Sequence, residues 1–161
     1  MTTPYTGNPP LRLLVKYQER FASGTPEVLF HLAERDVWVA GKFNDRAQFS
    51  CLSLEINPAL APTFTVQSAR QRKTVLGRPL PRWSRYPAGV IMVMSALGYD
   101  ARGFNAILCA DEPPGPRYEY GLGLLYAALV HELNNLSYNH AILSEIVDHV
   151  QREYVDSAAS G

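Results

Sequence analysis

The polar residues best suited to binding a ligand lie in one basic segment. Residues 70–85 contain six cationic side chains and no acidic one: Arg70, Arg72, Lys73, Arg78, Arg82 and Arg85. Guanidinium groups bind phosphates and carboxylates, and the rings of Trp83 and Tyr86 could stack on a nucleic-acid base. The formal net charge is zero, and no second basic stripe follows. We therefore favour a solvated loop, with Trp83 and Tyr86 in the core, over a nucleic-acid interface.

A second group of titratable residues lies near the C-terminus. It consists of His131, Glu132, His140, Glu145, Asp148 and His149. Glu145 and His149 are four residues apart, so on a helix they could share a metal ion or a hydrogen bond. No third ligand has a diagnostic spacing, and no Gly-x-Ser-x-Gly, Walker, Cys-x-x-Cys or His-Glu-x-x-His motif is present. We expect a solvated helix face, with no catalytic residue, metal or cofactor.

The composition predicts one globular domain. The chain has 161 residues, of which 47% are hydrophobic and 19% charged. No secretory signal or bilayer-length apolar run is visible, so we expect a cytoplasmic protein without a membrane partner. Cys51 and Cys109 lie in apolar segments, and we expect both to be buried free thiols. We assign residues 11–155 to the domain, 1–10 to a flexible N-terminus and 156–161 to a disordered tail.

The hydrophobic pattern predicts elements in the order helix, strands, helix, strand, helix, helix. The expected helices cover 11–22, 84–97, 122–133 and 139–154, with Ser84 as an N-cap, and a basic loop covers 69–82. The expected strands cover 28–33, 37–43, 47–56 and 104–110, with a short edge strand at 63–66. Short turns between the early strands favour an antiparallel meander, to which the later helix-strand-helix unit adds a strand. The predicted class is α+β: two layers, with an antiparallel or mixed sheet of four to five strands and helices on one face.

The segment from Trp83 to Leu133 contains a recognisable series of features. A helix opens with Trp83-Ser84-Arg85-Tyr86-Pro87-Ala88-Gly89-Val90 and ends at Leu97-Gly98; a strand opens with Gly103-Phe104; Pro113-Pro114-Gly115 precedes an Ala/Leu-rich helix. This order resembles the N-terminal domain of galactokinase-type GHMP kinases, which phosphorylate sugars and other small molecules. The resemblance covers about three-quarters of the chain and implies a fold similar to domain 2 of ribosomal protein S5.

The phosphate-binding motif of that family is altered here. In the family, a proline, a glycine pair and three serines lead into a helix whose N-terminus holds the nucleotide phosphates. The matching residues run from Pro114 to Gly121, and Glu119, Tyr120 and Gly121 replace the serines. A carboxylate repels phosphate, and Pro116 lacks an N–H donor. The resemblance leaves one remnant ligand site, made of Gly115, Arg117 and Gly121 with Arg72, Arg82 and Arg85 of the basic loop.

The resemblance implies that three further features of the family are missing. Its sugar-binding motif has no counterpart around residues 23–28, and neither His31 nor Glu34 falls on a family position. We expect His31 to be an ordinary strand residue. The family's catalytic aspartate and second domain would follow Gly161. Phosphoryl transfer depends on positioning and charge stabilisation, so the resemblance implies that this chain alone is not a kinase.

Four hypotheses about function remain open. The first is a non-catalytic binding or regulatory module that associates with itself or with a protein partner. In that case Tyr118, Tyr120 and Tyr126 belong either to an interface or to a repacked core. The second is a binding protein for a small phosphorylated ligand, either a nucleotide or a sugar phosphate. The third is one half of a split sugar kinase, and the fourth is an RNA-contacting domain.

Overall fold

The computed structural model describes residues 8–22 and 25–156. The helices are α1 (Leu11–Phe21), α2 (Val66–Arg70), α3 (Arg85–Ala96), α4 (Pro116–Leu133) and α5 (His140–Val150). The strands are β1 (Val28–Leu32), β2 (Val37–Phe43), β3 (Phe49–Ser53), β4 (Thr63–Phe64) and β5 (Phe104–Ala110). The expected flexible N-terminus and disordered tail lie mostly outside the described residues.

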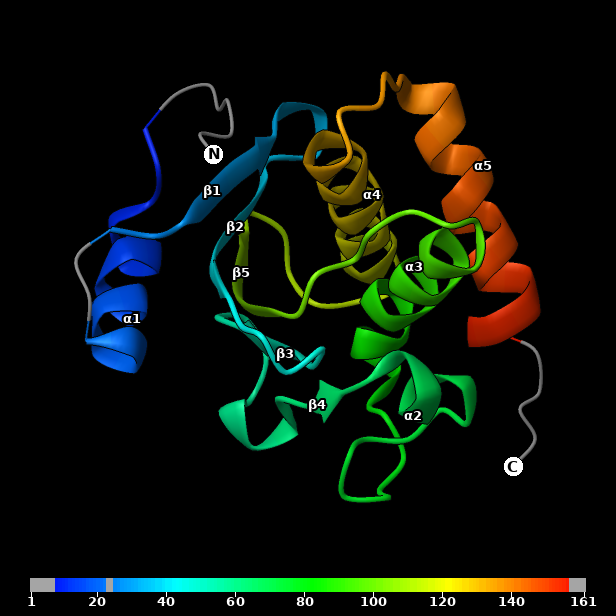
Figure 1. The fold of residues 1–161 in the computed structure, drawn as a ribbon. Coiled ribbons are helices and arrows are strands. Elements are labelled where there is room, and N and C mark those ends of the chain that lie inside the picture. Colours follow the sequence, from blue (N-terminus) through cyan, green and yellow to red (C-terminus); the bar gives the residue numbers. More distant parts are fainter. Residues whose placement is uncertain (1–7, 23–24, 157–161) are drawn as a thin grey trace.

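The five strands form one mixed sheet in the order β1-β2-β5-β3-β4. Strand β5 pairs antiparallel with β2 and parallel with β3 at the centre of the sheet (Figure 1). The predicted α+β class and five-stranded mixed sheet are confirmed, but the expected meander is wrong because β5 separates β2 from β3. Six of the seven residues of β5 are buried, and such a strand is most stable with a neighbour on each side.

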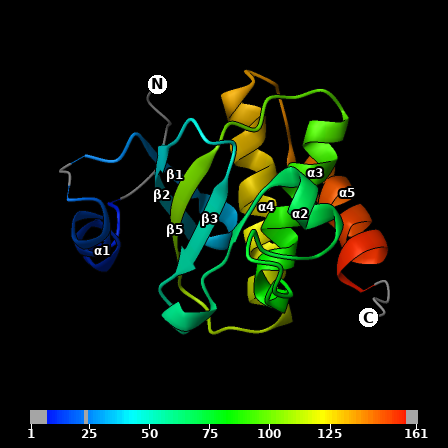
Figure 2. The ribbon, with the colours of Figure 1, turned by 60° about the horizontal axis from the view of Figure 1, so that its bottom comes forward.

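Helices cover both faces of the sheet. Figure 2 shows α3, α4 and α5 on one side and α1 on the other. Leu13 and Tyr17 of α1 pack on Trp38, Ala40, Leu52, Ile107 and Cys109, forming a core separate from the larger one. We expected helices on one face only. The second face needs a cover because β2 and β5 carry apolar side chains on both sides, and the amphipathic α1 buries that surface.

Helix α4 lies at the centre of the larger core. Leu122, Leu124 and Leu125 are fully buried even though they point in different directions around the helix. The sheet covers one side of α4, and α3 and α5 cover the other (Figure 1). Gly123 permits the close packing, because a Cβ at this position would lie 3.0 Å from Val147 and 3.2 Å from Tyr86.

Three local expectations require correction. The predicted basic loop 69–82 begins with the end of α2, which a reciprocal cap between Thr65 and Ser68 stabilises. Ser84 does not cap α3 with its side chain, because it belongs to a short 3-10 turn and donates a hydrogen bond to the carbonyl of Pro81 at 2.8 Å. Helix α4 begins at Pro116, six residues before its predicted start at residue 122.

Both cysteines are buried free thiols, as predicted. The sulfur of Cys51 lies 3.2 Å from the Tyr126 hydroxyl. Burial raises the pKa of Cys51 to about 12 and that of Cys109 to about 11, so neither is a reactive thiolate near neutral pH. In the part of the chain that the structure describes, no helix has the length and apolarity needed to cross a bilayer.

Candidate functional site

The start of α4, residues 115–121, is the place where the resemblance predicts a remnant phosphate site. These residues form the first turns of the helix rather than a loop, and Glu119 N–H already donates to the Gly115 carbonyl at 2.9 Å. Pro116 has no N–H, which leaves the amides of Arg117 and Tyr118 as the first-turn donors without a helical acceptor. A ligand phosphate would therefore meet few backbone donors at this helix end.

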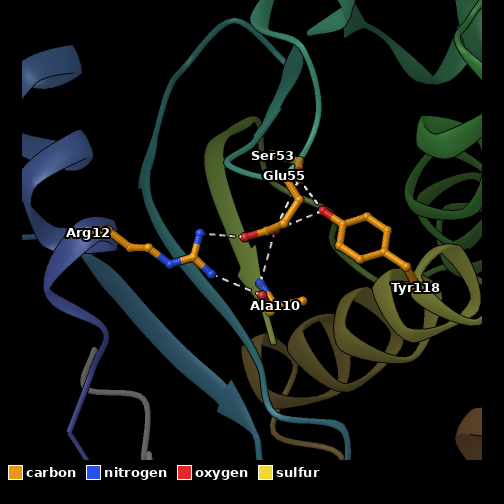
Figure 3. Close-up of polar contacts among 5 residues, drawn as sticks. All are labelled: Arg12, Ser53, Glu55, Ala110 and Tyr118. Atoms are coloured by element: carbon orange, nitrogen blue, oxygen red, sulfur yellow. Dashed lines mark hydrogen bonds and ion pairs between the residues drawn. The ribbon is translucent and has the colours of Figure 1, made fainter. Parts of the chain in front are cut away.

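Side chains fill the space between α4 and the sheet. We call Arg12, Ser53, Glu55, Ala110 and Tyr118 the Glu55 cluster (Figure 3). The Tyr118 hydroxyl contacts Ser53 Oγ and donates to Glu55 Oε1 at 3.1 Å. The same oxygen accepts the Ala110 N–H at 3.1 Å. The cluster thus connects the first turn of α4 to the ends of β3 and β5.

Arg12 extends the Glu55 cluster to the other face of the sheet. Its Nη1 lies 2.6 Å from Glu55 Oε2, and its Nη2 donates to the Ala110 carbonyl at 3.0 Å. Burial, with a further contribution from Glu55, raises the pKa of the Tyr118 hydroxyl far above neutral pH, so it stays a proton donor. The carboxylate of Glu55 is therefore held by four donor groups from two helices and the sheet, the fourth being Ser53 Oγ at 3.4 Å.

A second set of polar contacts lies on the other side of the start of α4. Arg82 Nε lies 3.4 Å from Glu119 Oε1, and Arg82 Nη2 lies 3.2 Å from Asp156 Oδ1. Burial raises the pKa of Glu119 above its usual value, and Arg82 offsets only part of that effect. Arg82 thus lies beside the start of α4, where Glu119 and Asp156 already pair with it.

The raised pKa of Glu119 predicts the effect of its replacement. The folded state binds the Glu119 proton more tightly than the unfolded state, so the carboxyl favours folding below its usual pKa of 4.5 and opposes it as the pH rises. We expect Glu119→Gln to raise the thermal midpoint at pH 7, with a gain that shrinks towards pH 4. Unfolding followed by circular dichroism at both pH values measures this. A variant that is less stable at pH 7 would show that attraction to Arg82 outweighs burial.

The other predicted site residues do not converge with these. Arg117 is exposed and pairs with Glu112 at 3.2 Å. Arg72 donates from Nε to the Tyr154 carbonyl at 3.0 Å and lies over the Tyr154 ring. Arg85 donates to the Leu80 carbonyl at 3.4 Å. These contacts are structural: Arg72 lies against Tyr154, and Arg85 lies beside the Leu80 carbonyl.

Gly121 and Gly123 form a glycine pair inside α4. The next three residues, Leu124, Leu125 and Tyr126, are buried, and the Tyr126 hydroxyl contacts Cys51. No serine follows the glycines, whether the family's motif is aligned with Gly115 or with this pair. A Cβ at Gly121 would meet only ordinary contacts at 3.7 Å, so close approach of a ligand is not needed to explain this glycine.

The aromatic residues clarify two of the open alternatives. Tyr118 and Tyr126 are buried, which supports the repacked core, while Tyr120 is partly buried and donates to Asp148 at 2.7 Å. Trp83 and Tyr86 are buried as predicted, so neither can stack on a nucleic-acid base.

Three of the histidines make contacts with other groups of the protein. His31 is a residue of β1 that stacks on Trp38 and contacts Asp36 at 2.9 Å, as expected of an ordinary strand residue. His140 contacts Glu34 at 3.1 Å. The predicted solvated face is wrong for His131, which is buried with Nδ1 2.6 Å from the Ala127 carbonyl. The described residues contain no group of three or more His, Cys, Asp or Glu side chains that could hold a metal ion.

Sequence reasoning missed Glu55 and Arg12. Neither belongs to a motif, and their residue numbers differ by 43. The available signal was a carboxylate inside the apolar strand expected at 47–56, since a buried acid needs a donor from elsewhere in the fold.

Comparison with solved structures defines the class of fold. The structure is similar to galactokinase from Lactococcus lactis, solved with galactose, with a TM-score of 0.60 and 16% identity over 76% of this chain and 31% of that chain. It is also similar to mevalonate kinase from Methanococcus jannaschii, with a TM-score of 0.56 and 10% identity over 77% of this chain and 38% of that chain. No protein-family model and no curated protein matches the sequence.

The chain therefore has the α+β fold of the GHMP kinases. The resemblance to these kinases that the sequence predicted is confirmed at the level of the fold, and a galactokinase is among the similar structures. The chain spans about a third of the length of these kinases.

Proposed function

We propose that this domain does not transfer phosphoryl groups and acts instead as a binding or regulatory module with a GHMP kinase-like fold. The observation that carries this proposal is the closed start of α4. The Glu55 cluster fills its sheet side, and Glu119 with Arg82 occupies the other.

The chemistry of phosphoryl transfer explains why this matters. Catalysis depends on donors and cations that hold the phosphates and neutralise charge in the transition state. Here two carboxylates, Glu55 and Glu119, lie beside the helix start where the kinases' phosphates are expected. Three of the nearby cations are already paired with acids: Arg12 with Glu55, Arg82 with Glu119, and Arg117 with Glu112. A fourth, Arg35, donates to the Arg117 carbonyl at 3.4 Å and lies over the Tyr120 ring. A nucleotide phosphate that recruited Arg12, Arg82 or Arg117 would have to break its ion pair.

An ADP-release assay tests the proposal. Purified protein is incubated with MgATP and, in turn, galactose, mevalonate and a panel of other sugars. We expect no release above the rate without acceptor. Acceptor-dependent release that increases with protein concentration would contradict the proposal. Release that requires a second, separately produced chain would support a split kinase, and thermal stabilisation by a sugar phosphate alone would support a small-ligand binder.

A further inference from the structure

A groove lies on the surface beside the edge strand β4. We call it the Leu76 groove; it is bounded by Leu60, Pro62, Thr63, Val75, Leu76 and Arg78, and its volume is about 490 Å³. No residue of the Glu55 cluster lines it. The loop after α2 forms one wall, at the bottom of Figure 1, and the short turn 58–60 forms the other.

The loop wall is a small, hydrogen-bonded hairpin. Thr74 N–H donates to the Arg78 carbonyl at 2.7 Å, and Gly77 N–H donates to the Thr74 carbonyl at 2.9 Å. Gly77 has a φ of 80°, which favours glycine at this turn. Val75 N–H donates to the Thr63 carbonyl at 2.9 Å and attaches the hairpin to β4. The groove is therefore preformed, which lowers the entropic cost of binding.

Three apolar side chains along the groove are exposed. Leu76 at the tip of the hairpin is 80% exposed, Leu60 on the opposite wall 48% and Val75 41%. Exposed apolar side chains gathered along one groove can contact another molecule together. All of the groove's hydrophobic lining is aliphatic or proline.

The charge around the groove has one sign. No Asp or Glu occurs between Glu55 and Asp100, while six cations do. Arg72, Arg82 and Arg85 are held by contacts within the protein. The other three, Arg70, Lys73 and Arg78, are exposed and make no ion pair within the described residues. Arg78 lines the groove, and Lys73 lines an adjoining cleft that shares Thr74 and Val75 with it.

We propose that the Leu76 groove binds an acidic peptide segment of a partner protein. Apolar side chains of the segment pack against Leu60, Val75 and Leu76, and its carboxylates pair with Arg78 and Lys73. The volume lies within the range of ordinary ligand sites and suits a few side chains of an extended segment. Single-stranded nucleic acid fits less well, because it stacks its bases on aromatic rings and the groove contains none. This inference rests on the proposed function and gives it a surface and a class of partner.

Peptide selection tests the inference. A phage-displayed library of random dodecapeptides is selected on the intact protein, and the enriched sequences are synthesised and measured by fluorescence polarisation. We expect an excess of Asp and Glu around Leu, Ile, Phe or Met. Both Leu76→Ser and Arg78→Glu should weaken binding about tenfold or more, since each removes an exposed contact without disturbing the core. The matched control is Leu97→Ser, because Leu97 is 62% exposed but lies outside the groove; it should change the affinity less than about twofold.

The opposite results would overturn the inference. These are enriched peptides without an acidic excess, peptides that bind Leu76→Ser as well as the unchanged protein, or a single-stranded oligonucleotide that displaces them from the groove. The two proposals fail separately. If no peptide binds and no ADP is released, only the proposed docking site is ruled out. If peptides bind but ADP is also released, only the proposed lack of catalysis is ruled out.

Discussion

The substitution Glu55→Ala is expected to lower the free energy of unfolding by about 3 kcal/mol. Glu55 accepts hydrogen bonds from the buried Ala110 N–H and Tyr118 hydroxyl, and alanine leaves the first of these without an acceptor. It also removes the partner of Arg12, although that side chain is about half exposed and regains water. Urea unfolding of both proteins measures the difference.

Two further variants separate the role of the Glu55 cluster from a general effect of removing charge. Glu55→Gln keeps an acceptor oxygen and should cost less than half as much as Glu55→Ala. Glu19→Ala removes an exposed carboxylate that pairs with Lys16 on α1, and it should change stability by less than about 0.5 kcal/mol. If Glu55→Ala were as mild as Glu19→Ala, the Glu55 cluster would not hold α4 against the sheet.

The second large effect is expected at Gly41, in the middle of β2. A Cβ at this position would collide with the Phe104 ring and lie 2.6 Å from the Asn105 carbonyl oxygen, both on the neighbouring strand β5. Because the backbone of a central strand must then move, Gly41→Ala should destabilise the protein by about 3 kcal/mol or more. Thermal unfolding followed by circular dichroism measures the effect.

Gly121 provides the matched control, with the opposite sign. It lies inside α4, where a Cβ would make ordinary contacts at 3.7 Å with Arg35 and Val37. Alanine favours a helix over glycine, so Gly121→Ala should stabilise the protein by roughly 0.5–1 kcal/mol. Destabilisation by Gly121→Ala would indicate that the start of α4 needs a glycine for a reason other than helix geometry.

The sequence predicted individual elements well where the hydrophobic pattern was strong. Strands β2 and β5 have the bounds expected from their dense runs of apolar residues. Strand order was not predictable, because pairing of β5 between β2 and β3 depends on which neighbours bury it best. The covering of the second face by α1 was missed for the same reason: an amphipathic pattern shows that a helix buries one side but not which surface receives it.

The position of the candidate site at Pro114–Gly121 stays a prediction from the resemblance, as does the expectation that Glu119 opposes phosphate binding. The contacts that these residues make were not predicted. The early start of α4 was obscured by its polar first turn, Arg117 to Tyr120, which interrupts the apolar period. The Glu55 cluster joins residues far apart in the chain, so its formation depends on tertiary packing that no local pattern encodes.

The closed start of α4 is tested most directly by nuclear magnetic resonance of the ¹⁵N-labelled protein during titration with MgATP. The amides of Arg117 to Gly121 report on any phosphate that reaches this helix end. The proposal predicts that their shifts stay unchanged up to millimolar nucleotide. Saturable shifts confined to these amides would contradict it, because they would show that nucleotide displaces the side chains that fill the site.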